Sequence, residues 1–110
     1  MDDRPKARAD EQSGRITVHR EADGHVLHLS GDVDALVVDK LTSDHAVNEL
    51  RIVAVDVGEL RYIDSTARTF LVRWAQDVRR HGRAAEIRRT TKRFERVLEV
   101  AGLTPLFVVN

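Results

Sequence analysis

The sequence predicts one small α/β domain in which a strand hairpin precedes alternating helices and strands. Residues 51–57 are almost entirely apolar and β-branched, which is typical of a central strand buried on both faces. Residues 15–29 alternate polar and apolar side chains around a glycine-containing turn, as the two strands of an antiparallel hairpin do. The segments that follow carry apolar residues at helical spacing. Together these patterns predict a small mixed sheet with β-α crossover units.

Length and composition restrict the possible classes of protein. The 110 residues suffice for one hydrophobic core, and 18 basic and 18 acidic residues balance to zero net charge, which gives no general attraction to nucleic acid or to an acidic membrane. The absence of cysteine excludes disulfides and thiolate metal sites. Residues 1–14 are polar and without periodicity, so we expect a disordered leader before a domain at 15–110. With no apolar leader segment, a cytoplasmic location is expected.

The first half of the chain is expected to place carboxylates at a strand end. The hairpin turn falls at 22–24, and its second strand ends in Gly31-Asp32-Val33-Asp34, where Asp34 is a candidate helix N-cap. Residues 35–50 are expected to form one helix, with an apolar face of moderate regularity.

The second half repeats the strand-to-helix arrangement. After the central strand and a polar break at 59–61, a helix is predicted over about 65–81, with Asp64 or Ser65 as N-cap and Gly82 just beyond its end. A short strand at 84–87 precedes a helix that Thr90 or Thr91 caps and Gly102 ends. Residues 106–109 form the closing strand.

Several kinds of chemistry fit the sequence poorly. The glycines of a hydrolase nucleophile elbow are missing around Ser65, where Ile63 and Ala67 stand instead. Asp56 at a strand end resembles a phosphoacceptor, but the first strand lacks the acidic pair that would hold Mg²⁺. The five histidines are scattered, and no phosphate-binding glycine loop is present. We therefore expect no catalytic residues, no metal site and no cofactor.

A basic run between Arg79 and Arg96 is better explained by a solvated face than by nucleic-acid binding. Acidic residues interrupt it, and few aromatic residues accompany it to stack on bases. No nucleic-acid partner and no direct membrane contact are expected.

The motifs in their order resemble those of the STAS family. By itself, Asp64-Ser65-Thr66 is explained by helix capping. It stands, however, after Gly31-Asp32-Val33-Asp34 and before a final helix that ends in Ala101-Gly102-Leu103, and this combination is similar to STAS domains. The family includes the tails of sulfate transporters and bacterial anti-sigma factor antagonists. The resemblance covers about residues 15–109 and implies a mixed sheet in sequential order with helices against it.

The resemblance also implies a function and a site. In the antagonist branch, an anti-sigma factor with serine kinase activity phosphorylates the hydroxyl directly after the motif's aspartate, which here is Ser65, with Thr66 as the second choice. Where the family motif usually continues Gly-Leu-Gly, this chain has Ala67-Arg68-Thr69, and the arginine changes a surface that in the family can meet the partner. The residues implied in partner binding are Asp32, Asp34, Asp64, Ser65, Thr66 and Arg68.

Three functional hypotheses follow. The first is an anti-sigma factor antagonist, not an enzyme, that binds its anti-sigma factor when Ser65 is unmodified, releases it on phosphorylation and thereby regulates sigma-factor-dependent transcription. The second is a docking subunit that is never phosphorylated, similar to the STAS partners of ABC-type lipid transporters, or another scaffold. The third is a small-ligand sensor, although no residue points to a pocket. An exposed edge strand also makes a homodimer possible.

Overall fold

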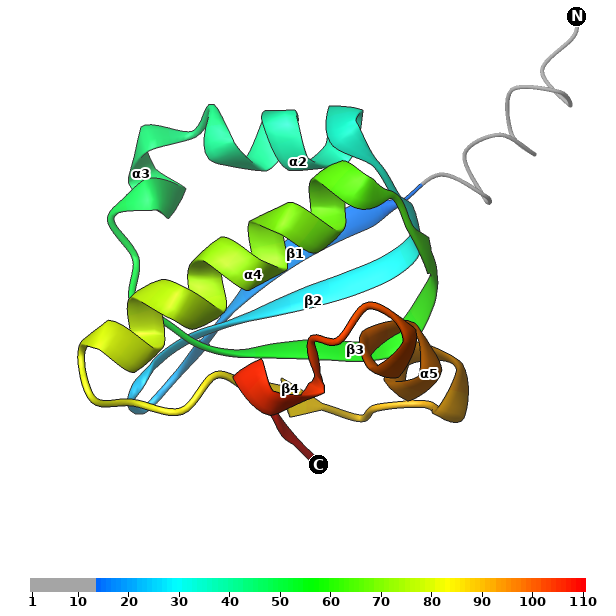
Figure 1. Ribbon diagram of the computed structural model, residues 1–110. Coiled ribbons are helices and arrows are strands. Elements are labelled where there is room, and N and C mark those ends of the chain that lie inside the picture. Colours follow the sequence, from blue (N-terminus) through cyan, green and yellow to red (C-terminus); the bar gives the residue numbers. More distant parts are fainter. Residues whose placement is uncertain (1–13) are drawn as a thin grey trace, which may run out of the picture.

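The computed structural model describes residues 14–110 and contains one five-stranded sheet with its strands in sequence order, β1-β2-β3-β4-β5 (Figure 1). Strands β1 (Arg15–Glu21) and β2 (Gly24–Val33) form an antiparallel hairpin. Strands β3 (Ile52–Ile63), β4 (Glu86–Arg88) and β5 (Val108–Val109) then add in parallel. This topology confirms the predicted mixed sheet. The predicted leader lies outside the described residues, apart from Gly14.

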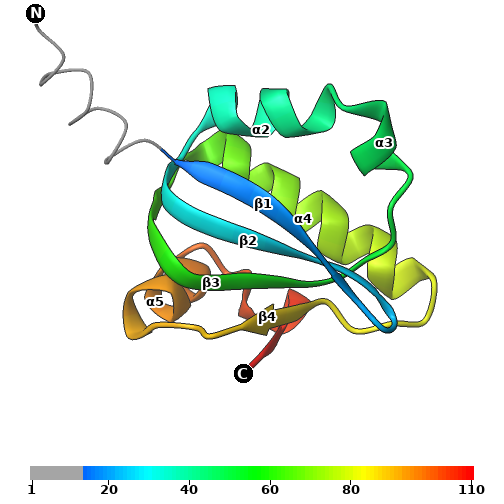
Figure 2. The same ribbon diagram turned by 180° about the vertical axis from the view of Figure 1, so that it is seen from behind.

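The helices lie against one face of the sheet, and Figure 2 shows the strands from the side that no helix covers. They are α2 (Ala35–Thr42), α3 (His45–Asn48), α4 (Ser65–Arg80) and α5 (Lys92–Val100), followed by the 3₁₀ turn η1 (Thr104–Leu106). None of these helices combines the length and the apolar character that crossing a lipid bilayer requires.

The prediction of one helix over 35–50 was wrong, because local side-chain bonds divide it into α2 and α3. The hydroxyls of Thr42 and Ser43 donate to the carbonyls of Val38 and Asp39 at 3.0 and 2.6 Å. Asp44 then caps a new helix by accepting the N–H of Ala46 at 2.9 Å. Serine, threonine and aspartate compete with helical backbone bonds in this way.

The predicted polar break at 59–61 was also wrong, because β3 continues through it to Ile63. Strand β2 pairs alongside that whole segment, with Ser30 opposite Glu59 and Val33 opposite Ile63. Pairing with a neighbouring strand therefore outweighs the low strand propensity of the polar residues. As a result, β2 and β3 end side by side.

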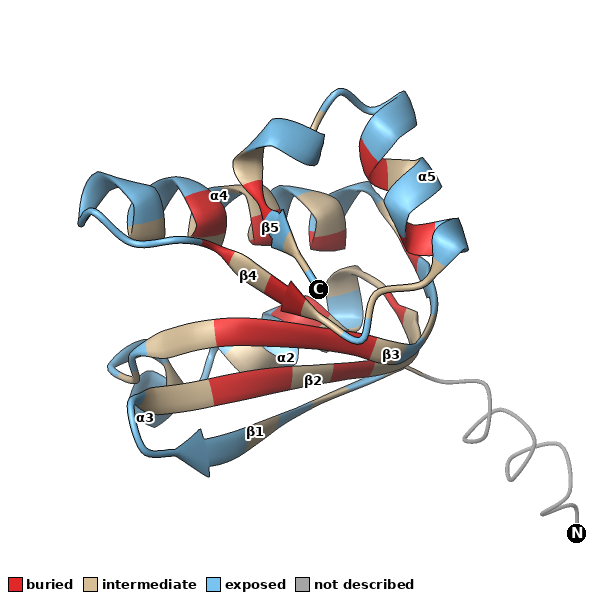
Figure 3. Ribbon diagram, turned by 90° about the horizontal axis from the view of Figure 1, so that it is seen from below, coloured by how far each residue is buried: buried red, intermediate tan, exposed pale blue. Residues whose placement is uncertain are grey.

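The hydrophobic core lies between the sheet and the helices, as the buried segments in Figure 3 indicate. Val55 and Val57 of β3 are fully buried in it, which confirms the central strand. The predicted ends of α4 and α5 are correct, since Gly82 and Gly102 adopt φ of 77° and 72° and the chain turns back after each. Other members of the core are Leu27, Leu29, Val33, Leu71, Ala75, Ile87, Phe94 and Leu98.

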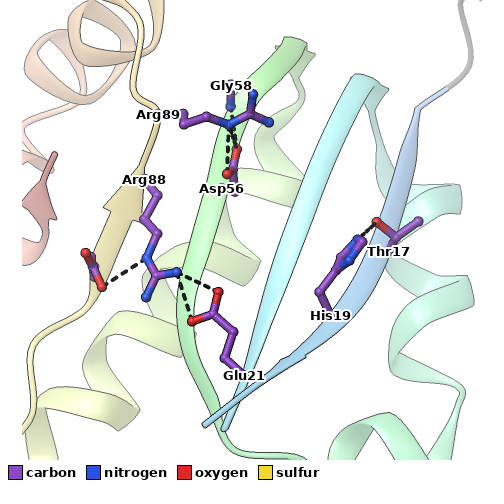
Figure 4. Close-up of polar contacts among 8 residues, drawn as sticks. Thr17, His19, Glu21, Asp56, Gly58, Arg88 and Arg89 are labelled. Carbon is purple, nitrogen blue, oxygen red and sulfur yellow. Dashed lines mark hydrogen bonds and ion pairs between the residues drawn. The ribbon is translucent and has the colours of Figure 1, made fainter. Parts of the chain in front are cut away.

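A layer of charged side chains lies on the sheet face without helices. The strand register places Asp56 next to Arg88 on β4, and Arg88 reaches across to Glu21 of β1 at 2.9 Å (Figure 4). Asp56 is only 7% exposed, and its two carboxylate oxygens accept the Arg89 Nε–H at 3.0 and 2.9 Å. The N–H of Gly58 donates to it at 2.9 Å. Burial by itself would raise the pKa of Asp56, but the bonds from Arg89 and Gly58 outweigh it and lower the pKa below 3.8.

This lowered pKa predicts a pH-dependent contribution of Asp56 to stability. Because the folded-state pKa lies below the unfolded value, the contribution is fully present above about pH 4 and is lost as the pH falls through the folded pKa. At neutral pH, Asp56→Asn should lower the free energy of unfolding by about 1–3 kcal/mol, since it weakens charge-assisted bonds at a buried group. Urea unfolding of both proteins at a series of pH values measures the difference.

The control for this experiment is Asp23→Asn, a charge removed from the exposed hairpin turn. It should change the free energy of unfolding by less than about 0.5 kcal/mol. The difference in the free energy of unfolding between the wild type and Asp56→Asn should shrink as the pH falls. If this difference stays constant down to pH 2.5, the carboxylate charge is not what stabilises this face.

Candidate functional site

The site forms where β2 and β3 end beside each other and each continues into a helix. Val33 lies opposite Ile63 in the parallel register, and the N–H of Asp64 donates to the carbonyl of Val33 at 3.2 Å. Because the carboxyl ends of parallel strands meet at the same edge of a sheet, the two predicted strand-to-helix junctions become one surface. The N-termini of α2 and α4 therefore lie next to each other (Figure 1).

The carboxylate of Asp64 holds both helix N-termini. Its Oδ1 accepts the N–H of Ala67 at 2.9 Å, so Asp64, rather than Ser65, is the N-cap of α4. Its Oδ2 accepts the N–H of Ala35, the first residue of α2, at 3.0 Å. Asp34 caps α2 separately through the N–H of Val37 at 3.1 Å, as predicted. Two carboxylates thus satisfy amides that a helix start leaves without backbone partners.

Ser65 and Thr66 are the first two residues of α4, and both are exposed. Within residues 14–110, neither hydroxyl takes part in a hydrogen bond with another protein atom. Since Asp64 provides the cap, the fold does not need these hydroxyls, and they are accessible to another molecule. Ser65 is therefore held in place by its backbone while its side chain faces solvent.

Arginines surround Ser65 on the side that faces α5. A surface hollow of about 550 Å³ between α4 and α5 is lined by Ser65 together with Arg61, Arg68 and Arg93. The Arg93 guanidinium donates to the carbonyl of Arg61 at 3.3 Å. Arg61 lies 4.0 Å from the carboxylate of Asp32, and the two side chains are 62% and 45% exposed. The helix N-terminus and these arginines make the surroundings of Ser65 favourable to an anion.

The structure brings most of the predicted site residues together but gives them different positions. Ser65 and Arg68 line the hollow toward α5, whereas Thr66 lines a second one toward α2, to which Ser65 also contributes. Asp34 and Asp64 are engaged in helix capping, and Asp32 lies at the margin beside Arg61.

Sequence reasoning missed four residues of this surface: Leu36, Tyr62, Arg61 and Arg93. Leu36 and Tyr62 are large apolar side chains that are 78% and 59% exposed on either side of the junction. Because both stand two residues from a capping aspartate in the sequence, they could have been predicted as part of this surface. Arg93 could not be found from the sequence, because it comes from α5 and reaches Arg61 only in the folded chain.

Comparison with known proteins agrees with this architecture. The family model described as "Mlab, STAS domain" matches residues 16–109, so the chain belongs to the STAS domain family. Among solved structures, the chain is similar to the phosphorylated form of the Bacillus cell fate determinant SpoIIAA, with a TM-score of 0.56 and 12% sequence identity. That match covers 86% of this chain and 90% of the SpoIIAA chain, and at this identity it shows the fold alone. Comparison with curated proteins gives no match.

The double role of Asp64 predicts that its loss destabilises the fold more than the loss of Asp34 does. Asp64→Ala removes an N-cap and leaves the Ala35 amide without its acceptor, for a total cost of about 2–3 kcal/mol in the free energy of unfolding. Asp34→Ala removes one cap and should cost about 1 kcal/mol. Urea unfolding at neutral pH compares the two variants, with Asp44→Ala on the short helix α3 as the control.

Amide hydrogen exchange provides the more specific readout. In Asp64→Ala, exchange should accelerate at both Ala35 and Ala67, because both amides lose the same acceptor. Acceleration at Ala67 alone would mean that Asp64 caps α4 without holding α2.

Proposed function

We propose that this chain is a protein-binding module of the anti-sigma factor antagonist type, and not an enzyme. In this proposal it binds a cytoplasmic anti-sigma factor with serine kinase activity while Ser65 is unmodified. Phosphorylation of Ser65 releases that partner and so regulates sigma-factor-dependent transcription. The observation that carries the proposal is the exposed hydroxyl of Ser65 beside a carboxylate that already caps the helix.

The surface around Ser65 suits a protein partner. Tyr62 offers exposed apolar area in the hollow that Ser65 lines, and Arg68 adds a charged group to the same hollow. Leu36 offers further exposed apolar area in the first turn of α2. Aromatic and arginine side chains are the types most often found at the centres of protein interfaces. In this proposal, Asp32 and Thr66 contribute the polar margin of the contact.

A phosphate on Ser65 would act on the partner rather than on the fold. It adds about −1.5 to −2 charges, and negative charge at the N-terminus of α4 is favourable to the helix. Arg68, which lines the same hollow, would further accommodate it within the chain. A partner that had packed on the neutral hydroxyl would instead have to bury this charge or move away.

A second candidate function is a docking subunit of an ABC-type lipid transporter that is not phosphorylated. Two observations favour it: the matching family model carries the description "Mlab, STAS domain", and Arg68 stands where phosphorylated relatives are expected to have an apolar residue. In this case Asp64-Ser65-Thr66 is a helix cap, and the same surface would contact an ATPase.

Intact mass and site mapping of the chain isolated from its own cells test the phosphorylation step. We expect a phosphatase-sensitive gain of one phosphate on Ser65 in part of the population. Absence of phosphate during growth, starvation and stress would contradict the switch and favour the docking subunit.

Binding experiments with charge variants test the consequence of phosphorylation. Ser65→Asp should weaken capture of the partner by tenfold or more, whereas Ser65→Ala should retain it. Ser43→Asp adds the same charge at an exposed position at the end of α2 and should bind like the wild type. If Ser65→Asp and Ser65→Ala both capture an ATPase as well as the wild type does, the chain is a docking subunit and the switch is wrong.

A further inference from the structure

A further pocket, which Ser65 does not line, lies toward the C-terminal end of α4. It has a volume of about 450 Å³, and its lining residues come from α2, α3, the last three turns of α4, β2 and the beginning of β3. Figure 1 shows where these elements lie. Ser65 and Arg68, which define the candidate partner surface, do not line it. The pocket thus requires an explanation separate from the proposed partner switch. Its volume is within the range of small-molecule sites.

The inner wall of this pocket is apolar. Phe70 and Trp74 come from α4, and the indole N–H of Trp74 already donates to the carbonyl of Ile52 at 3.1 Å. Trp74 therefore has no remaining hydrogen-bonding group to offer a ligand. The other apolar lining residues are Leu27, Leu41, Val47, Leu50, Ile52 and Val78. Such a wall favours a hydrocarbon group over a sugar or an inorganic ion.

The mouth of the pocket is positively charged. Arg51, Arg73 and Arg83 line it, all three are exposed, and within residues 14–110 none of them forms an ion pair with a carboxylate. Among the lining residues, Asp77 is the one acid, and it already pairs with Arg80 at 3.1 Å. A chain with no net charge therefore has a local positive excess at this opening.

We propose that this pocket binds an amphiphilic anion with a single hydrocarbon chain. The hydrocarbon chain packs against Phe70 and Trp74, and a carboxylate or phosphate head group lies among the three arginines. The apolar wall excludes a small inorganic anion as the preferred ligand, and the arginines disfavour a neutral or cationic amphiphile.

The single tryptophan of the chain, Trp74, reports directly on this site. Titration with decanoate and with decyl phosphate, both below their micelle concentrations, should change its fluorescence in a saturable way. Decanol and decylammonium have the same tail without the negative charge, and each should bind at least about tenfold more weakly. Comparison of the two anions shows which head group the arginines prefer. Equal binding of decanol or decylammonium, or no saturable signal with either anion, would overturn the proposal.

Variants separate the pocket from general electrostatics. The triple variant Arg51→Gln, Arg73→Gln and Arg83→Gln should weaken decanoate binding about tenfold, because each exposed charge contact contributes a few-fold. A matched triple variant, Arg15→Gln, Arg20→Gln and Arg96→Gln, removes the same charge from exposed arginines outside the pocket and should bind like the wild type. If the two triple variants weaken decanoate binding equally, the weakening comes from net charge and not from the pocket, and the proposal is overturned.

Filling the pocket provides an independent test. Val47 lies in α3, lines the pocket and is only partly buried, so the larger side chain of Val47→Phe can enter the pocket. This variant should abolish decanoate binding. Urea unfolding checks that the variant is folded, and calorimetry replaces fluorescence if Trp74 emission shifts. Unchanged binding in a folded Val47→Phe would place the ligand elsewhere. Ser65→Asp should bind decanoate like the wild type. Failure of the partner switch and failure of the ligand pocket can therefore be told apart.

Discussion

The contact on which the site depends is the bridge that one carboxylate makes between two helix starts. Asp64 accepts backbone amides from both α2 and α4, although the two helices are separated in the chain by a complete strand. A helix N-terminus has amides without partners and a partial positive charge, so a single anion between two of them stabilises both. The position of Ser65 follows from this bridge, since it is the residue next to the shared cap.

The two faces of the sheet are covered in physically different ways. Helices cover one face and build the hydrophobic core, while ion pairs lie across the other. Arg88 and Arg89 belong to the basic run that the sequence suggested was a solvated face, yet Arg88 pairs with Glu21, and Arg89 pairs with Asp56. Arg89 adopts φ of 53°, a left-handed conformation that is costly for a residue with a side chain. Its bonds to a buried carboxylate offset that cost.

The proposed partner surface and the proposed ligand pocket lie toward opposite ends of α4. Ser65 is the first residue of this helix, whereas Trp74 and Arg73 belong to its second half. The same helix contributes Leu71 and Ala75 to the core, so it is firmly packed along its length. A ligand that altered the packing of Trp74 would act on the element that also presents Ser65.

Local patterns in the sequence determined the class of fold, the hairpin, the central strand, the cap at Asp34, the choice of Asp64 or Ser65 as the cap of α4, and the ends of α4 and α5. Each of these depends on residues close together in the chain, such as a capping aspartate before an apolar run or a glycine after one. Tertiary structure decided the rest. Strand β3 extends through its polar residues because β2 pairs with them, and Arg93 joins the Ser65 surface because α5 packs there. The apolar pocket combines residues from β2, β3 and three helices, and no local pattern encodes the distances between elements that meet only on folding.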